Sequence, residues 1–491
     1  MNFGINDLIV IFTYISIVSI IGLYYSNTSS TRDFFLAGNK LPWYFIMLSI
    51  IATETSSLTF LNVPGISYKS DFSFLQIALG FIIGRIIVAF YILPAYYNNK
   101  YISVYQWIGE NLGIQTQKYM SGVFLITRVL GDGVRLYATS IPVSLIIRSY
   151  IGQNYSDFEI SLFTLFIISF STILYTVYGG FKTVVITDAI QFFIYIGGGI
   201  FALLYLLSSL PYHSFSEILN KGYELGKFKF YHGIEGNFFK SPYFLLNGLL
   251  GGILISIGSH GVDQMFVQRL LACKSLKESR RALIGSGILV FIQFLLFLSI
   301  GFLLFLFYSN TDIPQDKIFS KYIMENIPSP MVGIILAAVL ASAMSTLSSS
   351  INSMSLSFIV DFLKISNDSE SSLKSSKLIS IFWGIILFFS SLLPYFLSER
   401  STGGLVDLGL KISSFTFGPL IGLFLLAKSS ERLKYSSHEL VAVLLSTILL
   451  TICISYILLP STGLVIPMAL LIFTFNLAVV KIKQKVFQRT V

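Results

Sequence analysis

The sequence has little charge and few of the side chains from which reactive sites are built. Only 12% of its 491 residues are charged, 54% are hydrophobic, and the mean hydropathy is +0.77. A soluble domain carries about twice that charged fraction, so a soluble protein is excluded. The two cysteines, Cys273 and Cys453, are too few and too far apart for a disulfide framework or a metal cluster. With only four scattered histidines, no nucleophile–base set is evident, and we predict that the protein is not an enzyme.

Long apolar runs dominate the chain. Runs of about 20 residues or more fit membrane-crossing helices, whereas the strands of a membrane barrel would alternate over about 10 residues. We therefore predict an all-α polytopic membrane protein, a single domain over 1–491 that is surrounded by the lipid bilayer. The first run is not a signal peptide, because no basic residue precedes it and no small-residue cleavage site follows it. Thirteen spans are predicted, at 5–24, 42–65, 74–97, 119–147, 158–180, 183–208, 243–262, 282–308, 331–363, 378–397, 402–427, 438–459 and 462–480.

The net charge of +9 reflects loop charge rather than a surface for nucleic acid. With the N-terminus outside, about twice as many lysines and arginines fall in the inside segments as in the outside ones. This bias predicts an outside N-terminus, a cytoplasmic C-terminus and no nucleic-acid partner. We expect a cell membrane, most simply a bacterial inner membrane, because no organelle signal is present. The chain reaches Val491 soon after its last span, so we expect no appended signalling domain.

The ninth span carries an unusual number of hydroxyl groups in the stretch from Leu340 to Ser353. A stripe of oxygen atoms at membrane depth suits a hard cation such as Na+, which prefers oxygen ligands. The alternative is contact between helices, because serine and threonine are enriched where transmembrane helices touch. The stretch alone leaves both interpretations open. At helical spacing one face holds Ser342, Ser345, Thr346, Ser349 and Ser353.

Two spans look broken, at 51–59 and at 257–264, where polar residues and glycines interrupt the apolar run. Interrupted helices at corresponding places in two halves indicate a transporter built from inverted repeats, with its site near the middle of the membrane. Each broken span opens a set of five. We therefore predict a first repeat over 42–208 and a second over 243–427, with one extra helix at 5–24 and two at 438–480.

Five segments together resemble the signature regions of the sodium:solute symporter family. The resemblance implies the leucine-transporter-like fold, an inverted repeat of five plus five helices, and solute transport coupled to Na+. The segments follow the family's order across nearly the whole chain. They are Arg32–Asn39, Tyr178–Gln191, Gly261–Arg269, Leu340–Ser353 and Phe415–Gly422.

The resemblance also implies a sodium site where the first core helix breaks. Carried over position by position, its ligands are the carbonyls of Ala52, Thr55 and Ser342 and the hydroxyls of Ser345 and Thr346. A broken helix does free carbonyl groups, and irregular backbone at that depth is tolerated where it lines a site.

A second sodium site is implied at Asp188, where Ser348 and Ser349 supply hydroxyls and Ser345 is shared with the first site. A carboxylate inside a span is costly and usually functional. The alternative is that Asp188 pairs with a basic loop residue.

Glu54 places a carboxylate in the first break. It could attract Na+, contact a cationic part of the solute, or pair with an arginine inside the membrane. Arg135 falls where a sialic-acid-transporting branch of the family has an arginine that holds the substrate carboxylate, a role for which a planar guanidinium is suited. The alternative is a pair between Arg135 and either Asp132 or Glu54. Further candidate solute contacts are Ser56, Thr59, Phe74 and Gln76.

We therefore predict a Na+-coupled symporter that imports a small polar organic solute by alternating access. Arg135 favours a solute with a carboxylate, such as an amino acid, a monocarboxylate or an acidic sugar. The alternatives are an H+-coupled transporter and a non-transporting membrane sensor of the same fold.

Overall fold

The computed structural model describes residues 4–25, 30–97, 101–151, 155–212, 214–231, 245–308, 313–315, 317–364, 370–397, 405–429, 435–458 and 462–490. The regular elements within these ranges are helices, which confirms the predicted all-α class. Within them, nine helices are long and apolar enough to cross a membrane, or ten when a bent pair is counted as one span.

The helices of the first half are α1 (Ile5–Tyr24), α2 (Thr31–Leu36), η1 (Ala37–Asn39), α3 (Trp43–Glu54), α4 (Ser57–Lys69), α5 (Leu75–Ile87), η2 (Val88–Ile92), α6 (Leu93–Tyr97), α7 (Val104–Leu112), α8 (Ile114–Ile151), α9 (Asp157–Ser209) and α10 (Phe215–Glu224). Those of the second half are α11 (Leu245–Ile257), η4 (Gly258–Val262), α12 (Gln264–Leu271), α13 (Leu276–Phe307), α14 (Ile318–Asn326), α15 (Met331–Ser357), η5 (Phe358–Leu363), α16 (Glu370–Ser390), α17 (Leu393–Leu397), α18 (Leu405–Lys428), α19 (Ser437–Leu458) and α20 (Thr462–Thr490).

The helix α9 is two spans joined by a turn at Gly180. At 53 residues it would be about 80 Å long if straight, far more than one crossing needs. Gly180 has a φ of +61°, which glycine adopts readily. Residues on either side of it meet: the Tyr175 hydroxyl donates to the Met344 carbonyl at 3.0 Å, and Gln191 donates to the Tyr14 hydroxyl, which lies 3.8 Å from the Met344 sulfur. The chain therefore folds back at Gly180, the last residue of the predicted span 158–180.

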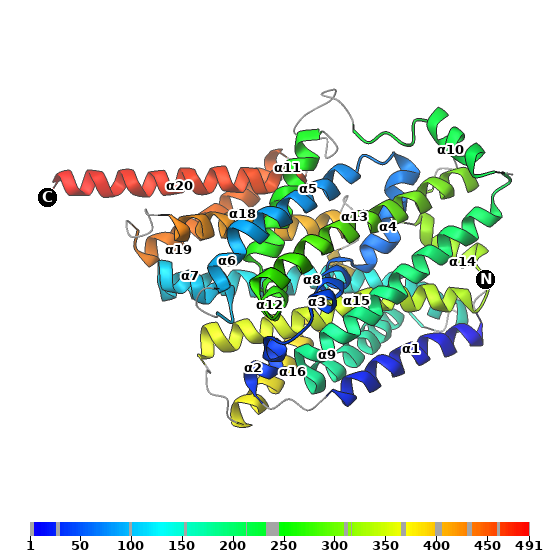
Figure 1. Ribbon diagram of the computed structural model, residues 1–491, viewed down its shortest axis with the longest axis horizontal. Coiled ribbons are helices and arrows are strands. Elements are labelled where there is room, and N and C mark those ends of the chain that lie inside the picture. Colours follow the sequence, from blue (N-terminus) through cyan, green and yellow to red (C-terminus); the bar gives the residue numbers. More distant parts are fainter. Residues whose placement is uncertain are drawn as a thin grey trace.

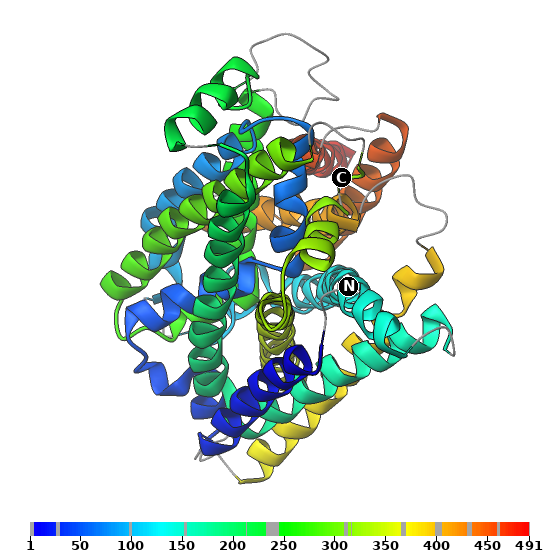
Figure 2. The same ribbon diagram turned by 90° about the vertical axis from the view of Figure 1, so that its right-hand side faces the viewer.

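The serine-rich helix α15 lies in the middle of the bundle. Of its most apolar stretch, 89% is buried, against 22% for the peripheral helix α1. Figure 2 shows α15, in yellow-green, surrounded by other helices, and Figure 1 shows α1 and α20 towards opposite edges. Small side chains allow this close approach, because they let neighbouring backbones come together. The hydroxyls of α15 consequently face protein rather than lipid.

An outer segment, α10 and the residues that follow it to 231, is fastened to the end of α4 by one lysine. The Lys227 ammonium donates to the carbonyls of Ser67, Tyr68 and Ser70 at 3.1, 2.8 and 2.8 Å. These are among the carbonyls that a helix end leaves without helical donors. The neighbouring Phe228 packs edge-on against an aromatic ring at a centroid distance of 5.4 Å. The segment is therefore held to the second half, α4, of the first broken helix.

The variant Lys227→Met should change how stability depends on pH. Burial lowers the pKa of Lys227 from 10.5 to about 8, against a smaller opposing effect of Asp71. The unfolded chain therefore binds more protons than the folded chain across this window, and the free energy of unfolding rises with pH. The melting temperature of the wild type minus that of the variant should increase from pH 8 to pH 10. The exposed Lys229→Met is the control, and a difference that stays constant would contradict the prediction.

Candidate sodium and solute site

The first broken helix has the predicted interruption. The helix α3 ends at Glu54, the next two residues are extended, with φ and ψ of −83° and 99° at Thr55 and −87° and 167° at Ser56, and α4 begins at Ser57. The two halves meet at 64°. This confirms the break predicted within 51–59. Because α3 stops here, carbonyls of its last turn are left without helical donors.

The stripe of α15 faces this break. The hydroxyl of Thr346 donates to the carbonyl of Thr53 at 3.2 Å and to that of Ser342 at 3.1 Å. Thr53 stands between Ala52 and Thr55, whose carbonyls are the predicted sodium ligands. The set is buried and offers carbonyl and hydroxyl oxygens, the donor chemistry that a hard cation prefers. The residues present therefore fit Na+.

Asp188 lies in a second group of buried oxygens, between α3, α9 and α15. Its carboxylate accepts hydrogen bonds from the hydroxyls of Ser345 at 2.6 Å and Ser49 at 2.5 Å. It also pairs with Arg269 of α12, whose Nη2 lies 3.2 Å away and donates to the Ser349 hydroxyl as well. Asp188 therefore has a basic partner, as in the alternative, but this partner lies in helix α12 and not in a loop.

The second break combines a π-helical turn with a capping carboxylate. After η4 the backbone of Asp263 is extended, with φ −96° and ψ 124°, and α12 begins. The Asp263 carboxylate accepts from the Met265 amide at 2.9 Å, which caps α12, and from the Arg128 guanidinium of α8. This confirms the break predicted within 257–264. The same contacts fasten it to α8.

Asp132 holds two cations and a hydroxyl at the edge of a cavity. Its carboxylate lies 3.1 Å from Arg135 Nη1 and 3.6 Å from Arg128 Nη1, and it accepts from the Ser350 hydroxyl at 2.5 Å. The pair between Asp132 and Arg135, left open from the sequence, is therefore formed.

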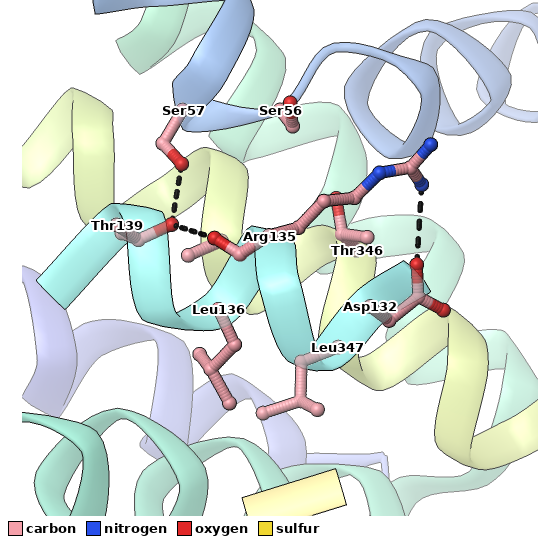
Figure 3. A pocket seen from close by; sticks show the side chains of 9 residues that line it. Ser56, Ser57, Asp132, Arg135, Leu136, Thr139, Thr346 and Leu347 are labelled. Carbon is pink, nitrogen blue, oxygen red and sulfur yellow. Dashed lines mark hydrogen bonds and ion pairs between the residues drawn. The ribbon is translucent and has the colours of Figure 1, made fainter. Parts of the chain in front are cut away.

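The cavity itself lies where α4, α8 and α15 meet. Figure 3 shows the Arg135 side chain crossing it between α8 and the start of α4, where Ser57 bonds to Thr139. The cavity has a volume of about 10 Å³, roughly the room of one water molecule. Its lining is formed by Ser56, Ser57, Asp132, Arg135, Leu136, Thr139, Ala343, Thr346 and Leu347.

Comparison with known proteins identifies the family to which the chain belongs. The sequence profile described as Sodium:solute symporter family matches residues 34–437, which is most of the chain. The chain belongs to the sodium:solute symporter family. It is accordingly a sodium-coupled membrane transporter and not an enzyme.

Individual relatives of this symporter cover nearly its whole length. It is 28% identical over 442 residues to the sodium/sialic acid symporter SiaT of Proteus mirabilis, covering 88% of this chain and 86% of the relative. It is 25% identical to the sodium/sialic acid symporter NanT of Aliivibrio fischeri, covering 89% and 85%. A solved structure of a substrate-bound, outward-open Na+-coupled sialic acid symporter shares its fold, with a TM-score of 0.82, 23% identity and coverage of 96% and 97%. This confirms the predicted leucine-transporter-like fold.

Glu54 in this symporter pairs with Arg85, an arginine that was not among its named candidate partners. Its carboxylate pairs with the fully buried Arg85 of α5, and His260 Nε2 lies 3.9 Å from the same oxygen. The third proposed role, a pair with an arginine inside the membrane, is therefore realised with Arg85 and not with Arg135. A direct contact of Glu54 with Na+ or solute stays a prediction.

The other predicted contacts divide between the cavity and its surroundings. Of the predicted solute contacts, Ser56 and Arg135 are among the described residues that line the cavity. Phe74 packs edge-on against Phe294 at a centroid distance of 5.0 Å, Gln76 is 1% exposed, and Thr59 is half-buried one turn beyond the break. These three are not among the lining residues, and their part in binding solute remains a prediction.

Two buried arginines were missed because their partners are distant in sequence. Arg85 is fully buried within a span, and its pairing with Glu54 is a tertiary contact. The predicted spans 243–262 and 282–308 leave Arg269 in the loop between them, which is wrong, since α12 continues to Leu271 and the side chain is fully buried. The apolar residues at helical spacing between Met265 and Leu271 could have indicated a helix that contains Arg269. Mean hydropathy falls in this stretch, and the span was therefore ended before it.

Proposed function

We propose that this symporter imports a solute that carries a carboxylate, and that an acidic sugar of the sialic acid kind is the first to test. The position of Arg135 carries the proposal, because its guanidinium enters the cavity and its side chain is 22% exposed. Two relatives that span nearly the whole chain are described as sodium/sialic acid symporters. Their named solute is a carboxylic acid, and a guanidinium can hold a carboxylate through two parallel hydrogen bonds.

A helix end at the cavity also favours an anion, whereas the ionised side chains there balance one another. Asp132 neutralises only part of the positive charge of Arg128 and Arg135, and Asp263 takes the rest, so this group of four has no net charge. The start of α4 adds the positive end of a helix dipole at Ser56 and Ser57. A carboxylate between Arg135 and this helix end would meet two favourable fields.

The coupling ion is proposed to lie between the first break and α15. Its ligands would be the carbonyls of Ala52, Thr55 and Ser342 and the hydroxyls of Ser345 and Thr346. The bond from Thr346 to the Thr53 carbonyl supports this set, because it places the hydroxyl against the broken end of α3. When bound, Na+ supplies a positive charge that ties α3 to α15. The hydroxyl of Thr346, which lines the cavity too, connects the ion with the solute.

Transport requires the cavity to open, because about 10 Å³ is far less than the several hundred Å³ of a ligand pocket. We propose alternating access in which α8 separates from α4 and α15 to admit the solute. The repeats would be 42–208 and 243–427, and each contains one of the two breaks. The N-terminus would lie outside and the C-terminus in the cytoplasm, in a bacterial inner membrane.

Uptake into proteoliposomes tests the solute class. Radiolabelled sialic acid should accumulate with an inward Na+ gradient and not with a choline gradient. Unlabelled sialic acid should compete, whereas a neutral hexose should not. An inward H+ gradient without Na+ should drive no accumulation. Competition by the hexose, or accumulation without Na+, would contradict the proposed function.

A further inference from the structure

Asp188 and the hydroxyls around it form a buried cage of oxygen atoms. The carboxylate is fully buried, and hydroxyl groups of Ser49, Thr53 and Ser345 lie within 3.5 Å of it. Thr53 also bonds to Ser349 at 2.9 Å. These groups come from α3, α9 and α15, three helices that meet deep in the bundle. A buried carboxylate is compensated by hydrogen-bond donors and by a positive charge beside it.

Arg269 supplies that charge in this structure. Its Nη2 donates to both Asp188, at 3.2 Å, and Ser349, and its Nε donates to Ser49 at 2.9 Å. The Nη1 group donates to the carbonyl of Met265 one turn back in α12, at 2.7 Å. Two of the three nitrogens therefore have partners that do not depend on Asp188. The side chain could release the carboxylate and keep its hydrogen bonds to Ser49 and Met265.

We propose that Arg269 is a tethered cation that alternates with a second Na+ at Asp188, Ser345 and Ser349. This inference rests on the proposed sodium coupling. The guanidinium and the ion would share the Asp188 carboxylate and the Ser349 hydroxyl, and two cations within contact distance of one carboxylate repel each other. Sodium binding therefore displaces the Nη2 end of Arg269, and departure of sodium lets it return. Ser348, whose hydroxyl donates to the Ser345 carbonyl within α15, is not part of this exchange.

The exchange has a measurable consequence for sodium affinity. A site that is open for only part of the time binds its ligand with an affinity reduced by that fraction. Removing the tethered cation should therefore strengthen sodium binding. A purely structural Arg269 predicts the opposite: its loss would leave the cage disordered, and sodium binding would weaken or stay unchanged.

Equilibrium binding of ²²Na+ to the purified full chain, in choline chloride at constant ionic strength and without solute, tests the exchange. Arg269→Gln should bind two ions per chain, with a half-saturating Na+ concentration at least about fivefold lower than that of the wild type. The charge-neutral pair Asp188→Asn with Arg269→Gln should lose this gain and bind one ion. An unchanged titration in Arg269→Gln, or a gain that survives in the double variant, overturns the proposal.

A conservative variant decides the matter if Arg269→Gln does not fold. Lysine keeps the charge but lacks the fork that reaches Ser49 and Asp188 together, so Arg269→Lys competes more weakly and should bind Na+ more tightly than the wild type. An unchanged affinity in Arg269→Lys would then overturn the exchange. A wild type that binds no sodium at all would instead overturn the sodium site of the proposed function.

Discussion

Replacing Ser345 and Thr346 together by alanine should abolish sodium-driven accumulation of solute. Both hydroxyls belong to the proposed sodium site, and Thr346 also contacts the Thr53 carbonyl at the break. Without them the ion loses two oxygen ligands, and α15 loses its hydrogen bond to the Thr53 carbonyl at the broken end of α3. The solute gradient formed by proteoliposomes under an inward Na+ gradient should fall to that of empty vesicles.

The matched control is a pair of hydroxyls farther along α15. Ser353 and Ser355 are also buried, and each donates to a carbonyl of its own helix, at 3.2 and 2.6 Å. Their joint replacement by alanine also removes two buried hydroxyls of α15, at about 1 kcal/mol of hydrogen bonding each, and should leave accumulation intact. Thr346→Ser keeps the hydroxyl and should also remain active. Normal sodium-driven accumulation in the Ser345→Ala, Thr346→Ala protein would remove the basis for this site.

Replacing Arg135 by methionine should abolish binding of a carboxylate solute while sodium binding remains. A hydrogen bond to a charged group contributes about 1.5–3 kcal/mol, so the loss of a two-bond contact weakens solute affinity by at least about a hundredfold. Arg135→Lys keeps the charge but not the fork, and it should recover only part of the affinity. Asp132 retains Arg128 and Ser350 as partners, so the fold should persist.

Isothermal titration with sialic acid in Na+ measures this effect, and Arg148→Met is the control. Arg148 lies on the same helix, α8, but forms an exposed pair with Asp157, with side chains 40% and 65% exposed. Exposed pairs contribute little to stability, so its loss should leave solute binding unchanged. Equal affinities of the Arg135→Met protein and the wild type would show that Arg135 serves only to pair with Asp132.

The parts of the fold that depend on local pattern were predictable from sequence. The two breaks could be located because glycine and hydroxyl residues interrupt apolar runs, and they lie within the predicted ranges. The polar stripe of α15 could be assigned to one face because helical spacing fixes which residues share a face. The predicted span 158–180 also ends at Gly180, where the chain reverses.

The partners of buried charges were not predictable, because pairing depends on which helices become neighbours. Glu54 and Arg85 are 31 residues apart, and Asp188 and Arg269 are 81 residues apart. A hydropathy score is lowered by an arginine in the same way whether the side chain is in water or paired with a buried carboxylate. It therefore placed Arg269 outside the predicted spans. The pair between Arg135 and Asp132 was predictable, because the two residues are three apart on one helix.

Sodium and solute binding are expected to reinforce each other, because both sites use the first break and α15. Thermodynamic linkage requires the effect to be mutual: sodium raises the affinity for solute as much as solute raises the affinity for sodium. The Thr346 side chain is the shared element, with its hydroxyl on the Thr53 carbonyl and its surface in the cavity.

The most direct measurement is the melting temperature of the purified protein in Na+ and in choline, with and without sialic acid, a monocarboxylate, an amino acid and a neutral hexose. A ligand that binds only the folded state must raise the melting temperature. We predict that Na+ alone gives a rise, that sialic acid adds a further rise only in Na+, and that the hexose adds none. Equal melting temperatures in Na+ and choline, with or without sialic acid, would contradict sodium-coupled binding of an acidic solute.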